Sequence, residues 1–275
     1  MARLSVNEVT TYRWSFEEDV AHYARAGIAA MGVWRQKISD FGDERGVELL
    51  ADSGLRVSNL LWAGGFTGSD GRTFRDSVDD ALEAVELASA LGTDCLVVYT
   101  GPRSLHTHNH ARRLTRDALK AMLPPASELG ITLAIEPMHP QCAGEWTFLT
   151  TLDEALEFIR QFESPRIKLA LDTYHLGHDC SLVARIPEVV DSIGIVHLAD
   201  GRPPVGLEQD RTPLGKGQVP LKPLVQALEQ ANYCGYYDLE LTGEEIESVD
   251  YCRLLDESKR EFAQLCRCAG VQDML

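Results

Sequence analysis

The sequence lacks the cysteine pattern of a disulfide-stabilised protein or of a zinc site built from thiolates. Its seven cysteines are an odd number, and no two of them form a Cys-x-x-Cys pair. Disulfide frameworks use even numbers of cysteines, and thiolate zinc sites use closely spaced pairs. We therefore expect reduced thiols and a cytoplasmic location.

The sequence also has little of what a membrane or a nucleic acid requires. No apolar run approaches the ~18–20 residues of a membrane-spanning helix. The first residues, MARLSVNEVTTYRWSF, lack the apolar core of a signal peptide. The formal charge is −16, and Arg112, Arg113 and Arg116 form the densest basic patch. We expect no membrane segment and no nucleic-acid partner, because binding to a phosphate backbone depends on clustered positive charge.

Short apolar runs alternate with helical patterns along the whole chain. The predicted strands are Leu4–Val6, Ile28–Val33, Val57–Leu61, Cys95–Tyr99, Ile131–Glu136, Ile167–Asp172, Ile193–His197 and Tyr236–Glu240. Strands that alternate with helices form a parallel sheet through right-handed crossovers. Eight such units in 275 residues predict an α/β fold, a (β/α)8 TIM barrel, with residues 1–275 as a single domain. The absence of a Gly-x-Gly-x-x-Gly motif after the first strand disfavours a dinucleotide-binding fold.

Polar and glycine residues mark the ends of several predicted helices. Ser15 precedes an acidic first turn, and Gly54 and Gly92 follow the last turns of two helices. Ser248 is the candidate N-cap of the last helix, which is predicted over residues 248–268.

Each of the last four predicted strands ends in a side chain of a type that binds metals. These side chains are Glu136, Asp172, His197 and Glu240. All strands of a TIM barrel end at one rim, so we expect the four to converge. A single carboxylate there would pair with a cation or a helix terminus, but no matching row of Lys or Arg stands at the strand ends. Three neighbouring carboxylates repel one another unless a cation holds them, so the pattern predicts a metal site.

The predicted ligand set is rich in oxygen. Three carboxylates and one imidazole suit one divalent ion, with Mn²⁺ as the first choice and Mg²⁺, Co²⁺ and Zn²⁺ as alternatives. Four protein ligands leave positions on an octahedral ion for two adjacent oxygens of an α-hydroxyketone.

Two histidines follow these strand ends closely. His175 lies one turn beyond Asp172, and His139 lies three residues beyond Glu136, between two prolines. Each is a candidate to support a ligand, contact substrate or act as a general base. The alternative for His175 is a histidine that caps the following loop.

One arginine and two tryptophans complete the predicted site. Arg211 lies in a loop shaped by proline and glycine and offers a cation to a substrate oxygen. The alternative is an exposed arginine that pairs with Asp210. Trp34 and Trp62 follow the second and third strands, where they either stack on a sugar or pack against the barrel, and the same two alternatives hold for Trp14 and Trp146.

These residues lie in motifs that resemble the xylose isomerase-like TIM-barrel superfamily, in its sugar phosphate isomerase and epimerase group. The motifs are IEP at Glu136, LDTYH at Asp172, VHLAD at His197, DRTPLGKG at Arg211 and DLELTG at Glu240. The resemblance implies that Glu136, Asp172, His197 and Glu240 bind one divalent metal, commonly Mn²⁺. It also implies that Glu136 and Glu240 carry the proton transfers, and that His175 and Arg211 contact substrate.

The chain departs from the epimerase pattern after Glu136. The epimerases carry a further acidic residue there, whereas this chain has His139, and its next acid is Glu145. A histidine at this place resembles group members that act on 3-keto-glycosides, where it removes a proton next to the ketone. His139 is therefore a third candidate base.

The combined pattern predicts a divalent-metal-dependent sugar isomerase or epimerase. It would abstract a proton next to a carbohydrate ketone and form a metal-stabilised enediolate. One alternative is a lyase that eliminates the aglycone of a 3-keto-glycoside after the same step, and a weaker one is a non-catalytic protein that binds metal and sugar. We expect a small, non-phosphorylated carbohydrate, because no pair of arginines suited to a phosphate is evident. Homo-oligomer formation is left open.

Overall fold

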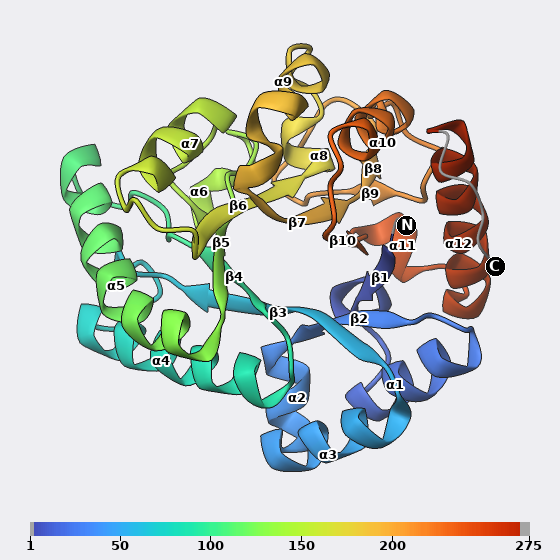
Figure 1. The fold of residues 1–275 in the computed structure, drawn as a ribbon, viewed down its shortest axis with the longest axis horizontal. Coiled ribbons are helices and arrows are strands. Elements are labelled where there is room, and N and C mark those ends of the chain that lie inside the picture. The colour runs from blue at the N-terminus through green and yellow to red at the C-terminus, as the bar shows by residue number, and fades with distance from the viewer. Residues whose placement is uncertain (1–2, 270–275) are drawn as a thin grey trace.

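The chain forms a closed barrel of parallel strands surrounded by helices (Figure 1). The computed structural model describes residues 3–269. The strand order around the barrel is β1-β10-β7-β6-β5-β4-β3-β2, and the barrel closes because β1 pairs with both β10 and β2. The barrel strands are β1 (Arg3–Asn7), β2 (Ala30–Trp34), β3 (Arg56–Gly64), β4 (Cys95–Tyr99), β5 (Thr132–Ile135), β6 (Ile167–Asp172), β7 (Ile193–Leu198) and β10 (Tyr236–Leu239).

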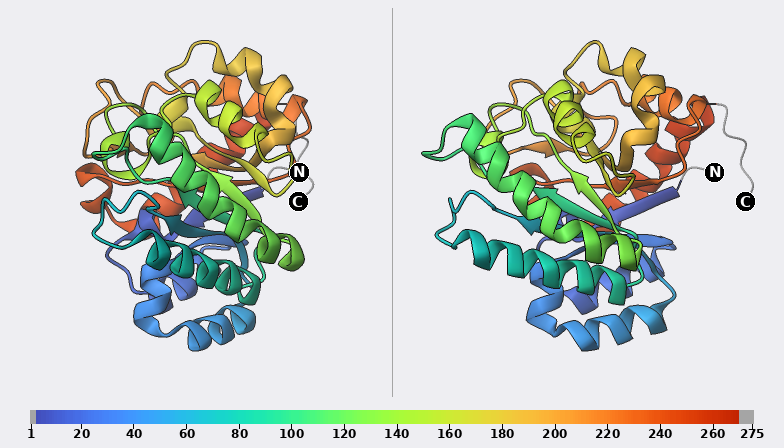
Figure 2. Two further views of the ribbon diagram at one scale, coloured as in Figure 1. Left: turned by 90° about the vertical axis from the view of Figure 1, so that its left-hand side faces the viewer. Right: turned by 60° about the vertical axis from the view of Figure 1, so that its left-hand side comes forward.

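Longer helices follow the strands and cover the outside of the barrel (Figures 1 and 2). They are α1 (Phe16–Arg25), α3 (Asp43–Ser53), α4 (Phe74–Ala90), α5 (His108–Leu129), α7 (Leu152–Arg160), α9 (Leu182–Val189), α10 (Leu221–Gln230) and α12 (Tyr251–Cys268). Helices α4 and α5 lie side by side along one flank of the barrel (Figure 2). Because helices cover the strands from outside and side chains fill the inside, a strand such as β4 is buried at every residue.

The helix start predicted at Ser15 is confirmed. Ser15 forms a capping box with Glu18, and Thr73 forms another with Asp76. The last helix is an exception, because Ser248 is not its N-cap. The Oδ1 atom of Asp250 accepts a hydrogen bond from the backbone N–H of Arg253 at 2.9 Å, and the helix begins at Tyr251. The prediction for Ser248 is therefore wrong by a few residues.

Short elements at the carboxyl ends of the strands are not evident from the sequence pattern. They are the helices η1 (Glu8–Thr11), α2 (Arg35–Phe41), α6 (Ala143–Trp146), α8 (Thr173–Leu176) and α11 (Glu244–Glu247), and the hairpin of β8 (Asp200–Gly201) and β9 (Arg211–Thr212). A further 3-10 turn, η2 (Val190–Ser192), leads into β7. Asp200 fixes the hairpin loop, because its carboxylate accepts hydrogen bonds from the backbone N–H groups of Gly215, Gly217 and Val219 at 3.0–3.1 Å.

One part of the barrel interior is polar. Asp238 on β10 is fully buried, and its Oδ2 atom accepts hydrogen bonds from the side-chain amides of Asn7 and Asn59, at 2.8 and 2.7 Å. Gly32 on β2 faces this group, and a Cβ atom on it would lie 2.4 Å from the same oxygen. The buried carboxylate thus joins strands β1, β3 and β10 through side-chain hydrogen bonds.

The structure confirms the predicted fold class. The barrel and its helices extend over the described part of the chain as one domain, while residues 1–2 and 270–275 of the predicted range 1–275 lie outside it. None of the helices within residues 3–269 combines the length and the apolar character that a bilayer crossing needs.

Candidate active site

The four predicted metal ligands reach the same point from four neighbouring strands. Glu136 follows β5, Asp172 ends β6, His197 lies in β7 and Glu240 follows β10. These strands are adjacent in the barrel, and Asp172 and His197 are direct partners across the β6–β7 pair. The apolar strands thereby carry four polar side chains to one side of the rim.

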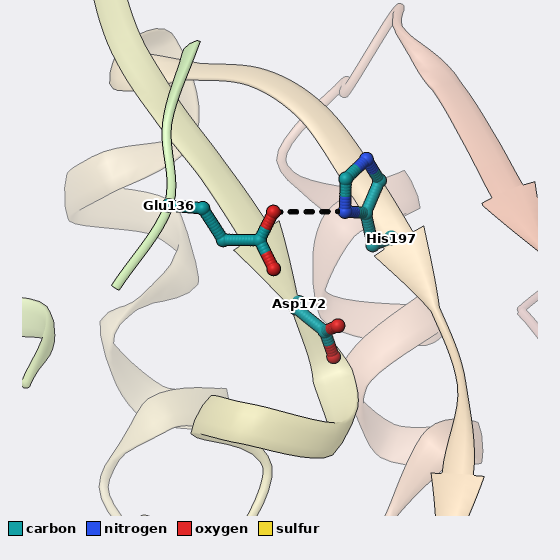
Figure 3. A group of neighbouring side chains, drawn as sticks. All are labelled: Glu136, Asp172 and His197. Carbon is teal, nitrogen blue, oxygen red and sulfur yellow. Dashed lines mark ion pairs between the residues drawn. The ribbon is translucent and has the colours of Figure 1, made fainter. Parts of the chain in front are cut away.

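The distances between these side chains suit a common ligand. One potential ligand atom each from Glu136, Asp172 and His197 lies within 4.8 Å of the others. Figure 3 shows the carboxylate of Glu136 turned toward the ring of His197, with Asp172 next to them. The Nδ1 atom of His197 lies 3.1 Å from Oε2 of Glu136 and 3.0 Å from Oε2 of Glu240. All four residues are buried, so their charges interact with little screening by water.

The charges shift the pKa values of the cluster in opposite directions. Burial raises the pKa of Glu136 to about 7, although His197 opposes the effect. Burial alone would lower the pKa of His197, but Glu240 and Glu136 raise it well above its ordinary value. Burial alone would raise the pKa of Glu240, but His197 and Arg211 hold it below its ordinary value. The cluster therefore favours a positive charge at its centre.

Several buried polar atoms of the cluster have no hydrogen-bond partner. Within residues 3–269, this is true of both carboxylate oxygens of Glu136, both ring nitrogens of His197 and Oε2 of Glu240. Unpaired buried polar atoms are costly, and several that face one another indicate a site for an ion. The oxygen-rich set fits a divalent cation such as Mn²⁺ or Mg²⁺.

Arg211 is buried beside two of these acids. Its Nη2 atom lies 2.8 Å from Oδ2 of Asp172 and 3.1 Å from Oε1 of Glu240, and Nη1 donates to the hydroxyl of Thr242 at 2.7 Å. The alternative of an exposed arginine paired with Asp210 is wrong, because Arg211 is only 2% exposed. Burial alone would raise the pKa of Asp172, but Arg211 holds it below its ordinary value.

The two histidines lie in different surroundings. His175 is buried with its Nε2 atom 3.9 Å from Oδ2 of Asp172, and burial lowers its pKa to about 4, which keeps the ring neutral at neutral pH. His139 is partly exposed, and its ring lies against that of His178 with a centroid distance of 5.7 Å. Its Nδ1 atom accepts a hydrogen bond from the backbone N–H of Gln141.

A cavity of about 200 Å³ borders Glu240, and we call it the inner cavity. Four of the predicted site residues line it, namely Trp34, Trp62, Arg211 and Glu240. Five others, within residues 3–269, are not among its lining residues, namely Glu136, His139, Asp172, His175 and His197. The structure thus brings both predicted tryptophans to a cavity that one of the four candidate ligands lines.

Other lining residues are not singled out by the sequence analysis. They are Val9, Leu61, Tyr99, Met138, Glu208, Gln209 and Thr242, while Trp146, a further candidate for stacking on a sugar, also lines the cavity. Tyr99 is the last residue of β4, so its place at a strand end is a signal that could have identified it. Gln209 and Glu208 lie on the loop before β9 and carry no comparable signal.

Comparison with known proteins agrees with this architecture. The L-ribulose-5-phosphate 3-epimerase UlaE of Escherichia coli O1:K1 / APEC is 29% identical over 141 residues, which are 51% of this chain and 46% of UlaE. The D-psicose 3-epimerase of Enterocloster bolteae is 30% identical over 118 residues, which are 42% of this chain and 36% of that protein. The chain thus spans less than half the length of these curated relatives.

The whole fold is shared with a solved structure. Protein SMc04130 from Sinorhizobium meliloti 1021 superposes with a TM-score of 0.86 at 27% identity, covering 96% of this chain and 98% of that one. Residues 20–267 match the family described as xylose isomerase-like TIM barrel. The chain therefore belongs to the xylose isomerase-like TIM barrel family.

Proposed function

We propose that this chain is a divalent-metal-dependent isomerase or epimerase of a keto sugar. The observation that carries the proposal is the buried cluster of Glu136, Asp172, His197 and Glu240, which has polar atoms without a hydrogen bond and borders an aromatic-lined cavity through Glu240. A divalent cation held by these four side chains would polarise the substrate carbonyl and acidify the neighbouring C–H bond.

The two glutamates are the proposed proton carriers. Both place an Oε2 atom within 3.1 Å of the same nitrogen of His197. Glu136 follows β5 and Glu240 follows β10, so strands β6 and β7 lie between them in the barrel. One carboxylate removes the proton next to the ketone, and the other returns a proton to the opposite face of that carbon, which gives an epimer. Return to the neighbouring carbon gives the isomer instead.

The remaining polar residues are proposed to orient the substrate. Arg211 lines the inner cavity and is held in place by Asp172, Glu240 and Thr242, so its guanidinium is fixed before substrate arrives. His175 lies behind Asp172 and stays neutral, which supports a role as a hydrogen-bonding group.

The cavity supports a substrate without a phosphate. Among the residues that the structure describes, the cavity lining contains one cation, Arg211, and it already pairs with two carboxylates. A phosphate would also meet Glu208 and Glu240 there. The names of the relatives include a phosphorylated and an unphosphorylated ketose, and the charge of the cavity favours the second class.

A lyase acting on a 3-keto-glycoside is the second candidate. It shares the first proton transfer, and a second cavity next to the inner one offers room for an aglycone. The position of His139 beside His178 does not add to this candidate, and a role for His139 as base remains a prediction.

Deuterium exchange tests the proposal. The protein is loaded with Mn²⁺ and incubated in D₂O with D-psicose, D-fructose, D-tagatose and a 3-keto-glucoside, and the carbon-bound deuterium is measured by NMR. We expect exchange next to a ketone, abolished by Glu240→Gln or Glu136→Gln and retained in Glu83→Gln, which changes an exposed carboxylate on α4. Release of the aglycone would assign the lyase, and absence of exchange with bound metal would favour a sugar-binding protein.

A further inference from the structure

A second cavity lies beside the inner one, and the two share one wall. This outer cavity has a volume of about 450 Å³ and is bordered by the loops that follow β3, β4 and β5. Trp62, Tyr99 and Trp146 line both cavities. A molecule that enters the inner cavity therefore has a neighbouring space that is bounded by the same side chains.

The shared wall is a cluster of three aromatic rings. The ring centroids of Trp62 and Tyr99 lie 5.3 Å apart, those of Trp62 and Trp146 5.7 Å, and those of Tyr99 and Trp146 5.6 Å. Rings at these distances pack on one another and form a rigid surface. Trp62 and Trp146 are also partly exposed, so each presents a face to a ligand.

Two partly buried ion pairs hold the strand that carries Trp62. Arg35 donates to the backbone carbonyl of Trp62 at 3.2 Å, and Arg72 donates to that of Gly64 at 3.0 Å. Both guanidinium groups also bind the carboxylate of Asp80, at 3.0 Å each. The wall is thus positioned before a ligand binds, which reduces the entropy that binding costs.

The two volumes together leave room for a ligand larger than one sugar ring. Pockets for small molecules commonly measure ~300–1,000 Å³, and the inner cavity at about 200 Å³ lies below this range. With the outer cavity included, the site falls within it. A ligand that fills the whole site has one part next to the acids and a second part beyond the aromatic wall.

The outer cavity is suited to a neutral group rich in hydroxyls. Asp70 and Glu145 line it, and among its lining residues within 3–269 there is no Lys, Arg or His, although Asp70 pairs with Arg72 at 2.7 Å. A phosphate or carboxylate would meet the carboxylate of Glu145 and no cation of the lining, whereas sugar hydroxyls donate hydrogen bonds to carboxylates and the C–H face of a sugar packs on an indole. Three glycines in the lining leave the backbone open to close approach.

We propose that the substrate is a glycosylated keto sugar, whose keto ring binds in the inner cavity and whose second sugar ring binds in the outer cavity against Trp62 and Trp146. The claim that the first ring is a keto sugar rests on the proposed function, whereas the claim that a second ring binds rests on the outer cavity itself.

Gly144 allows the outer cavity to be filled without strain. Among the described residues, no atom lies within 4 Å of the place where its Cβ would stand, and the residue has no positive φ. The other two lining glycines are unsuitable, because Gly65 and Gly101 have φ values of +75° and +85° and close neighbours. Gly206, on the loop after β8, has equally free surroundings and lines neither cavity, so Gly206→Leu is the matched control for Gly144→Leu.

The test compares D-fructose with three of its glucosides that keep a free ketone, namely turanose, leucrose and isomaltulose. Affinities are measured by calorimetry with Mn²⁺-loaded protein, and deuterium exchange is recorded on the same samples. We expect at least one glucoside to bind about tenfold more tightly than fructose, which corresponds to about 1.4 kcal/mol. Gly144→Leu should reduce this preference at least about fivefold, and Gly206→Leu should leave it unchanged.

The outcomes separate this inference from the proposed function. If no glucoside binds more tightly than fructose, or if Gly144→Leu keeps the full preference, the outer cavity does not bind a second ring, whatever the exchange experiment gives. If a glucoside is preferred but no sugar exchanges deuterium, the second ring is supported and the isomerase proposal fails.

Discussion

Arg211 and Asp172 form a buried ion pair in which Nη2 of the arginine lies 2.8 Å from Oδ2 of the aspartate. The other oxygen of Asp172 accepts hydrogen bonds from the backbone N–H groups of Tyr174 and His175. Asp172 is therefore fixed from two directions, whereas Glu136, which follows β5, makes no hydrogen bond among the described residues, and its Oε2 atom lies 3.1 Å from Nδ1 of His197. The pair links the loop before α10 to the four candidate ligands.

Replacing Arg211 by Gln should destabilise the metal-free protein and strengthen its response to metal. Removing one partner of a buried ion pair commonly costs about 3–5 kcal/mol of the free energy of unfolding. A divalent cation should then restore more stability than it adds to the wild type, because the competing positive charge is gone. Urea unfolding with and without Mn²⁺ measures both effects.

Arg253→Gln is the control for this experiment, because Arg253 pairs with Glu257 on the exposed face of α12. It should change neither the stability nor the response to Mn²⁺ appreciably. An Arg211→Gln protein as stable as the wild type would show that the buried pair does not stabilise the fold.

The periodic features of the sequence are sufficient to predict most of the fold. The apolar run Ile167–Asp172 predicts a strand, and β6 has the same bounds. Gly54 follows the last turn of a helix as predicted, because it closes α3 in the left-handed conformation. Helix α2 is not evident, because its first residue follows Trp34, which provides no side-chain cap. Local pattern predicts an element only where apolar spacing or capping is distinct.

The convergence of the four candidate ligands follows from barrel topology, since each ends one of four adjacent strands. The contacts that these residues make with loop residues do not follow from barrel topology, because they depend on loop conformation. The pairing of Arg211 with Asp172 and Glu240 depends on the β8–β9 hairpin, which the sequence pattern does not indicate. The packing of His139 on His178 joins two loops in the same way.

Gly32→Ala should lower the free energy of unfolding by about 1–3 kcal/mol, the usual cost of overpacking a buried position. The added Cβ would lie 2.4 Å from Oδ2 of Asp238 and under 3 Å from the side-chain amides of Asn7 and Asn59. These groups would have to separate, which weakens their hydrogen bonds. Thermal unfolding measures the loss.

Gly206→Ala is the matched control, because among the described atoms none lies within 4 Å of its Cβ position. Its stability should stay close to that of the wild type. Equal stability of the Gly32→Ala protein would contradict the close packing of this polar group.

Asp19→Asn should change the dependence of stability on pH. Burial, opposed by Lys37, raises the pKa of Asp19 to about 6, whereas an unfolded chain has a value near ~3.9. Between these values the folded protein holds a proton that the unfolded chain has released, so the contribution of Asp19 to stability falls as pH rises from about 4 to about 6. The difference in free energy of unfolding, wild type minus Asp19→Asn, should therefore decrease across this window.

Urea unfolding at several pH values between about 4 and 7 measures this difference. Asp79→Asn, on the exposed side of α4, should give a difference that hardly varies with pH. A difference that grows with pH for Asp19→Asn would mean that the attraction of Lys37 outweighs burial.

The central claim is that Glu136, Asp172, His197 and Glu240 bind a single divalent cation, and calorimetric titration of the metal-free protein with Mn²⁺ tests it most directly. We predict one equivalent per chain, with an affinity at least about 100-fold weaker in His197→Ala and in Glu240→Gln and unchanged in Glu83→Gln. Absence of binding to the wild type, or the same affinity in all four proteins, would contradict the account.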